Sequence, residues 1–181
     1  MTNDVIFNKY EVAKYLIYQY HKAFNGRLIT PIKLQKGLYF LFAMWGGKIL
    51  SGQADGVTDI EISVKGFHPY LFEPRFFAWR YGPVDEDIYH WFKNHTSFES
   101  FDITSEFQLK PETGITDEEY QIAADYIDNL SKRIFNTGDF ALVDLSHQDE
   151  CWKEARSRDE TPENTLMNNR RIIEEYAQSE A

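Results

Sequence analysis

The chain has 181 residues, of which 43% are hydrophobic and 16% aromatic, and its formal net charge is −10. This length suffices for one domain with a substantial core, and the apolar content excludes a disordered chain. The negative charge disfavours general nucleic-acid binding and favours basic protein partners. Cys151 is the only cysteine, and we find no basic or apolar leader and no apolar run of membrane-spanning length. These features predict a cytoplasmic protein with no disulfide and no membrane association.

The first predicted helix begins at Asn8, whose side chain is a good N-cap, and Glu11 completes a capping-box pattern. Asn25-Gly26 ends this helix, because both residues tolerate the left-handed conformation of a C-terminal cap. Apolar side chains recur at four-residue spacing on one face, namely Val12, Leu16 and Tyr20.

The second predicted helix is capped by Thr30, starts at Pro31 and stops at Gly46-Gly47. Lys33 and Lys36 fall off its apolar stripe, which places them on the polar face. The stripe itself consists of Leu34, Leu38, Leu41 and Trp45.

A small antiparallel sheet is predicted after the second helix. The stretch Ile60 to Val64 alternates apolar and polar residues as a half-buried strand does, and Phe76 to Trp79 offers another strand. Gly82-Pro83 then begins a third helix, with Pro83 in its first turn and acidic side chains from Asp85 to Asp87 near the positive end of the helix dipole.

The C-terminal half is predicted to be helical. Thr116 and Glu119 form a capping box for a helix that reaches about Phe135. Two shorter helices follow around residues 140–145 and 151–155, the last helix starts at Thr161-Pro162, and a short strand is expected at 107–109. The predicted fold class is therefore mainly α (α+β), a compact helical domain of about six to seven helices with a small antiparallel β-sheet inserted after the second helix.

Catalytic and metal-binding patterns are weak. Ser146, His147 and Asp149 have the residue types of a hydrolase triad, but neighbours on a helix point in different directions. His90 and His95 are five residues apart, which is not the spacing that places two metal ligands on one helical face. We therefore predict no catalytic residue, no metal and no cofactor.

Aromatic side chains are the feature that remains. Tyrosine and tryptophan anchor protein interfaces, although large aromatics also dominate protein cores. Gly82 and Pro83 are predicted as a structural turn beside them. The predicted protein-binding residues are Tyr39, Trp79, Tyr81, Tyr89, Trp91, His147 and Trp152.

Three segments in order resemble the Panacea domain family, also called the SocA-like family. Ile32 to Phe40 is similar to its Lys-Leu-Gln-Lys-Leu-Leu-Tyr-Phe signature, and Phe77 to Val84 to its Phe-x-Ala-Trp-x-Tyr-Gly-Pro-Val block. Leu145 to His147, followed by Cys151 to Ala155, resembles its Leu-Ser-His and Pro-Trp-x-x-Ala segments. The resemblance covers about residues 8 to 176 and implies a single domain over residues 1–181.

The chain departs from the family pattern at three places. Gly37 replaces the usual leucine, and Cys151 stands where proline is common. Residues of about 51–71 form an apparent insertion, and because loops carry specificity, this insertion bears on which partner is bound.

The resemblance implies a non-enzymatic antitoxin that neutralises a cognate toxin, the product of an adjacent gene, by direct binding. One type of family member is also a protease adaptor, which makes a cellular protease a second candidate partner. Two alternatives stay open at this point. The first is a phage or prophage accessory protein that binds another host factor, and the second is a hydrolase-like enzyme that uses His147.

Overall fold

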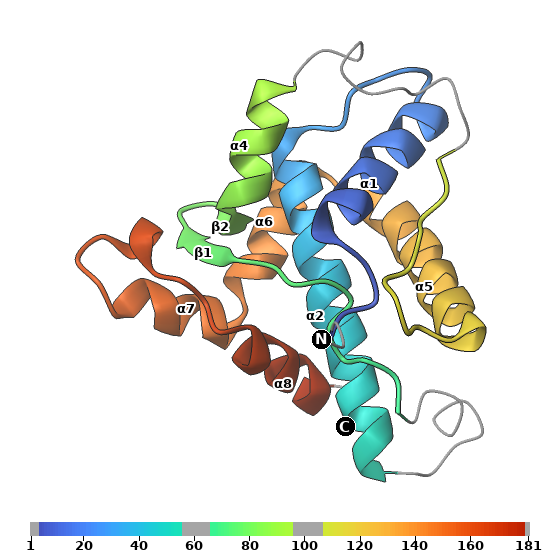
Figure 1. Cartoon of the computed structure of the whole chain (residues 1–181). Helices are drawn as coiled ribbons and strands as arrows, with labels where there is room; N and C mark the ends of the chain where they lie inside the picture. The colour runs from blue at the N-terminus through green and yellow to red at the C-terminus, as the bar shows by residue number, and fades with distance from the viewer. Residues whose placement is uncertain (1–3, 56–65, 96–106, 180–181) are drawn as a thin grey trace.

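The computed structural model describes residues 4–55, 66–95 and 107–179, with side chains described for all of these except 53–55. Within these ranges, helix α2 runs through the middle of the molecule and the other elements surround it (Figure 1). The predicted mainly α fold with a small antiparallel sheet after the second helix is confirmed. The elements in chain order are α1 (Lys9–Ala23), α2 (Pro31–Asp55), β1 (Phe76–Trp79), β2 (Gly82–Asp85), α4 (Glu86–Asn94), α5 (Asp117–Phe135), α6 (Asp139–His147), α7 (Glu150–Ser157), the short 3-10 helix η2 (Pro162–Asn164) and α8 (Asn169–Ser179).

Helix α1 begins and ends as its sequence predicts. The side chain of Asn8 accepts a hydrogen bond from the backbone N–H of Tyr10 at 2.9 Å, which satisfies one of the free amides of the first turn. After the helix, Asn25 and Gly26 have φ values of 52° and 82°. These left-handed residues turn the chain toward α2.

Helix α2 is longer than predicted, because Gly46-Gly47 does not stop it. Helix α8 crosses α2 at these two glycines. A Cβ built on Gly46 would lie 2.7 Å from the Cβ of Ile173, and one on Gly47 would lie 2.7 Å from the Cβ of Tyr176. The glycines therefore permit a close helix crossing, and the packing energy of α8 outweighs the low helix propensity of glycine.

The sheet is a hairpin of β1 and β2, in which Trp79 pairs with Gly82 and Phe76 with Asp85. The prediction that Gly82-Pro83 begins a helix is wrong, because both residues belong to β2. Helix α4 starts four residues after Gly82, at Glu86, where the carboxylate of Asp85 caps it by accepting from the backbone N–H of Ile88 at 3.1 Å. The expected strand at 60–64 lies outside the described residues, as does the middle of the expected insertion.

Helix α5 confirms its prediction, and Thr116 caps it by accepting from the backbone N–H of Glu119 at 3.2 Å. The carboxylate of Glu119 has a different use from the one that the capping box predicts. It accepts from the backbone N–H of His68 at 2.6 Å and so ties the chain before β1 to α5. The expected strand at 107–109 has irregular backbone instead.

The last helix starts later than predicted, at Asn169, and Thr161-Pro162 introduces only η2. The intervening chain is extended because it pairs with the free edge of β1. The backbone N–H of Met167 donates to the carbonyl of Phe76 at 2.7 Å, and that of Ala78 donates to the carbonyl of Thr165 at 3.0 Å. Backbone that serves as a sheet partner cannot also be helical.

Candidate protein-binding surface

Two polar side chains of α2 hold the second strand of the hairpin. The ammonium of Lys36 donates to the carbonyl oxygen of Pro83 at 2.9 Å. The amide of Gln35 makes a reciprocal pair with Asp85, donating to its carbonyl at 3.1 Å and accepting from its N–H at 2.8 Å. The Lys-Leu-Gln-Lys segment and the Tyr-Gly-Pro-Val segment are therefore parts of one contact. Because these bonds satisfy buried backbone groups, they fix the position of β2 on α2.

Lys36 is buried, although its place off the apolar stripe predicted a solvent-facing side chain. Only 1% of its surface is exposed, and burial lowers the pKa of its ammonium from 10.5 to about 7. The prediction was wrong because β2 covers this face of α2, and helical periodicity does not report a strand that arrives from fifty residues further along the chain.

Lys33 of α2 is also buried, because the C-terminal end of α5 packs against it. Its ammonium donates to the carbonyl oxygen of Phe135 at 3.0 Å and lies 3.5 Å from a carboxylate oxygen of Asp139. A cation at the C-terminus of a helix is favourable because the last carbonyls carry partial negative charge. Lys33 thus joins the start of α2 to the α5–α6 junction.

The hairpin turn packs closely against both α2 and α6 through Gly82. This glycine has a φ of 97°, which side-chain-bearing residues rarely adopt. A Cβ at this position would lie 2.7 Å from Cε of Lys36 and closer still to the hydroxyl of Ser146. The two-residue turn, Arg80 and Tyr81, is therefore held rigidly with its side chains directed outward.

Four predicted aromatic residues lie together around this hairpin. The rings of Trp79 and Tyr89 are 4.9 Å apart, and those of His147 and Trp152 stack at 4.2 Å. The two pairs are joined because the indole N–H of Trp152 donates to the carbonyl of Trp79 at 3.0 Å. All four side chains are half-buried, so they support the hairpin and also expose part of their rings.

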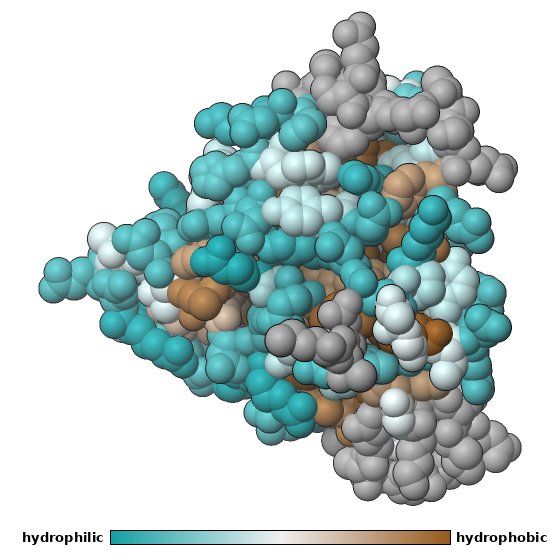
Figure 2. Space-filling model, in the orientation of Figure 1, coloured by the Kyte–Doolittle hydropathy of each residue, from teal (hydrophilic) through white to brown (hydrophobic). Residues whose placement is uncertain are grey.

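The most exposed apolar side chains of this region are Tyr81 and Phe140, at 51% and 66%. Their rings lie 6.4 Å apart, which brings the hairpin turn and the first turn of α6 into one patch. Sequence reasoning selected Tyr81 but not Phe140. Figure 2 shows a face of the molecule that is mainly hydrophilic with small hydrophobic areas.

A pocket of about 380 Å³ adjoins this patch between the start of α2, the hairpin and α4. Apolar and aromatic side chains line it together with four polar or charged ones, namely Pro31, Ile32, Trp79, Tyr81, Val84 and Tyr89 with Gln35, Lys36, Arg80 and Glu163. We call Tyr81, Phe140 and this pocket the hairpin surface. Its shape and apolar lining suit an apolar side chain of a binding partner.

Two other predicted binding residues lie elsewhere. Tyr39 is completely buried on α2, where its hydroxyl donates to the carboxylate of Asp149, so it is not part of any surface. Trp91 packs against Tyr10 of α1, with ring centroids 5.6 Å apart, away from the hairpin turn. Their aromatic character alone could not distinguish these positions from Trp79 or Tyr81.

A hydrolase-like enzyme that uses His147 is one alternative that the sequence leaves open. Its candidate residues, Ser146, His147 and Asp149, do not form a triad. The hydroxyl of Ser146 is buried and donates to the carbonyl of Val143 at 2.8 Å. His147 makes its bond to the carbonyl of Arg80, at 3.0 Å, and Asp149 accepts from two tyrosines. Each side chain therefore has a separate structural partner.

The thiol of Cys151 is buried, and burial raises its pKa to about 12. Because the thiolate is the reactive form, burial disfavours reaction of this thiol at neutral pH. In the described part of the chain, no three His, Cys, Asp or Glu side chains are grouped so that they could hold a metal ion.

None of the helices in residues 4–55, 66–95 and 107–179 has the length and apolarity needed to cross a membrane.

These features define a mainly α domain that presents a rigid aromatic hairpin beside an apolar pocket. A model of the family described as "Antitoxin SocA-like, Panacea domain" matches residues 61–153, just over half of the chain. The chain belongs to this family, which confirms the resemblance. The match covers the hairpin, α4, α5 and α6 and ends within α7. Comparisons with curated proteins and with solved structures give no match.

Proposed function

We propose that this protein is a non-enzymatic antitoxin that neutralises a cognate toxin by direct binding at the hairpin surface. Family membership supports the antitoxin role. The observation that carries the choice of surface is the pair of exposed rings, Tyr81 and Phe140, beside an apolar pocket.

The hairpin is a suitable anchor because it is rigid before any partner binds. Buried bonds from Gln35 and Lys36 hold its second strand, and the indole of Trp152 holds its first. Little conformational entropy is then lost on binding, so the buried aromatic area contributes more fully to affinity. Tyr81 is the central candidate for a residue whose loss weakens binding strongly.

The net charge of −10 indicates a basic toxin. Complementary charge accelerates the encounter of two proteins and is screened by salt. We expect the association rate constant to fall as ionic strength rises, while the dissociation rate constant changes little.

The test is co-expression with the product of the adjacent gene, followed by affinity measurements on purified proteins. Replacing Tyr81 and Phe140 by serine should weaken toxin binding at least tenfold, about 1.4 kcal/mol, and abolish rescue of growth. Leu166→Ser is the matched control, because Leu166 is 50% exposed but pairs with Phe77 in the first half of β1.

Two results would contradict the proposal. If the adjacent gene product is not toxic, or is toxic but neither bound nor rescued, the antitoxin role fails and a phage accessory protein with another host target becomes the better explanation. If the toxin is bound equally by the double variant, the antitoxin role stands but the hairpin surface is not its site.

A further inference from the structure

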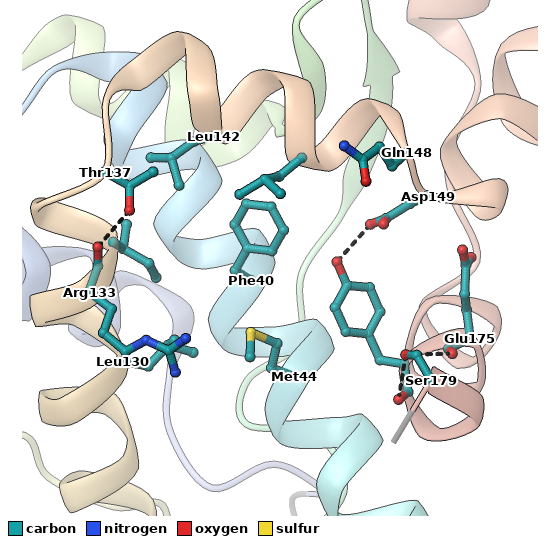
Figure 3. A pocket seen from close by; sticks show the side chains of 13 residues that line it. Phe40, Met44, Leu130, Arg133, Thr137, Leu142, Gln148, Asp149, Glu175 and Ser179 are labelled. Atoms are coloured by element: carbon teal, nitrogen blue, oxygen red, sulfur yellow. Dashed lines mark hydrogen bonds between the residues drawn. The ribbon is translucent and has the colours of Figure 1, made fainter. Parts of the chain in front are cut away.

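A second cavity, of about 450 Å³, lies between α2, α5, α6 and α8 (Figure 3). We call it the four-helix cavity. Phe40 and Met44 of α2 form its floor, and Leu142 of α6 lies above them. Arg133 projects from the α5 side, and Asp149 lies on the opposite side, before α7. The cavity therefore combines an apolar floor with opposite charges on facing walls.

Asp149 has an unusual orientation for its position. It is the N-cap residue of α7, where an aspartate normally accepts from the amides of the first turn, but its side chain makes no capping bond. Its carboxylate accepts instead from the hydroxyls of Tyr39 and Tyr176, the latter at 2.8 Å. The carboxylate thus faces the cavity and not the helix.

A second carboxylate performs the capping in its place. Glu175 of α8 accepts from the backbone N–H of Glu150 at 2.7 Å and from that of Cys151 at 2.8 Å. The fold therefore satisfies the α7 amides without Asp149. Asp149 therefore has no part in capping α7, and its carboxylate lies with the two phenols at the wall of the cavity.

The charge of Asp149 is poorly compensated within the chain. Its two donors are neutral phenols, and burial raises the pKa of its carboxyl group. The charge of Glu175 adds to this shift, and the charge of Lys153 opposes it, although the ammonium of Lys153 bonds to Glu150 at 2.8 Å. A half-buried carboxylate in such surroundings attracts a cation from outside.

We propose that the four-helix cavity receives a basic side chain, lysine or arginine, of a protein partner, with its charged end at Asp149. The inference rests on the proposed function in taking that partner to be the toxin. The aliphatic stem of such a side chain would pack on Phe40 and Met44. The net charge of −10 favours a partner that carries basic groups.

The two sites are linked by α6, which borders both. Phe140 at its first turn belongs to the hairpin surface, and Leu145 at its last turn lines the four-helix cavity and is 48% exposed. The helix has nine residues and is therefore about 13 Å long. Residues five apart point about 140° away from each other around a helix, so a partner that contacts both sites must extend around α6. It would place an apolar side chain at the first site and a basic one at the second.

The test uses hexylammonium as a probe for the basic side chain and hexanol as its neutral counterpart. The chain has three methionines, Met1, Met44 and Met167, so labelled methionine methyl groups give three resonances. Hexylammonium should shift the Met44 resonance in a saturable way, with an affinity at least tenfold above that of hexanol. The Met167 resonance, from a buried side chain outside this cavity, should not move.

Variants distinguish the effect of the Asp149 charge from that of the cavity volume. Asp149→Asn keeps an oxygen that accepts from the two phenols and should remove the preference for hexylammonium, whereas Arg133→Gln should keep or increase it. Leu145→Trp fills the mouth of the cavity while leaving the bonds of Asp149 intact, and should abolish binding of both probes. Equal affinity for the two probes, no shift at Met44, or an unchanged preference in Asp149→Asn would each overturn the inference.

A second experiment measures binding of the toxin itself. In a toxin complex, Asp149→Asn should weaken binding at least tenfold, and an exposed control outside both sites, Asp125→Asn on α5, should not. If the adjacent gene product proves not to be a toxin while hexylammonium binds as expected, the proposed function fails and the cation site stands. If the toxin is bound and Asp149→Asn changes nothing, the antitoxin role stands and this inference fails.

Discussion

The hairpin surface and the four-helix cavity use buried polar groups in opposite ways. At the hairpin, Lys36 and Gln35 direct their polar ends to the backbone of β2, where they bond to the carbonyl of Pro83 and to both backbone groups of Asp85. At the cavity, Asp149 and the phenol of Tyr176 bond to each other beside empty space. The contact of β2 with Gln35 and Lys36, which we call the structural joint, therefore fixes the hairpin and presents aromatic rings. The carboxylate of Asp149 instead remains available to a ligand at the cavity.

The largest effect on stability should come from a side chain at Gly82, where the hairpin packs closely on α2 and α6. In Gly82→Val, the positive φ and the contact with Lys36 and Ser146 act together, and we expect the free energy of unfolding to fall by about 3 to 5 kcal/mol. Gly114→Val is the matched control, since Gly114 has a φ of 94° but open space around it, and it should lose only about 1 to 2 kcal/mol. Urea unfolding measures both, and equal losses would show that close packing at Gly82 does not matter.

The buried amine of Lys36 should make stability depend on pH. Burial lowers its pKa from 10.5 to about 7, so between these values the unfolded chain binds more protons than the folded one. Stability should therefore rise with pH across this window, by on the order of 1 kcal/mol per pH unit. Lys36→Met should flatten this slope.

An exposed lysine provides the comparison for that measurement. Lys132→Met removes an ammonium from the surface of α5 and should keep the slope of the unmodified protein. If Lys36→Met also keeps it, the amine is not the group responsible, and the joint at β2 tolerates a charged lysine.

A smaller effect is expected at the cavity. Burial raises the pKa of Asp149 in the folded chain above its value of 3.8 in the unfolded chain. The protonated carboxyl group therefore stabilises the fold fully below pH 3.8, and this stabilisation is lost as pH rises through the folded pKa. Asp149→Asn should be as stable as the unmodified protein at low pH and slightly more stable at pH 7. A variant that is less stable at pH 7 would mean that the carboxylate serves the fold and not a ligand.

The smallest effect on stability is expected at the hairpin surface itself. Tyr81→Ser and Phe140→Ser remove exposed rings, so each should change the free energy of unfolding by no more than about 0.5 kcal/mol. A loss of toxin binding without a loss of stability would mark these side chains as contact residues. A loss of several kcal/mol in either variant would instead place them in the structural joint.

Local signals predicted a large part of this fold. Asn8 and Thr116 cap their helices as expected, because capping depends on a side chain and on amides two or three residues away. The aromatic character of the chain led to Trp79, Tyr81 and Trp152, which do lie close together. The predictions failed where a distant segment decided the outcome, as at Gly46-Gly47 and at Pro83.

The sequence by itself determined the helical class, the helix caps and the aromatic block, since these depend on residues close along the chain. Only the tertiary structure decided that Lys36 is buried, because β2 covers it, and that Asp149 faces a cavity, because Glu175 caps α7 in its place. Both outcomes follow from one physical rule. A buried polar group must find a partner, and the partner is chosen by whichever segment packs against it.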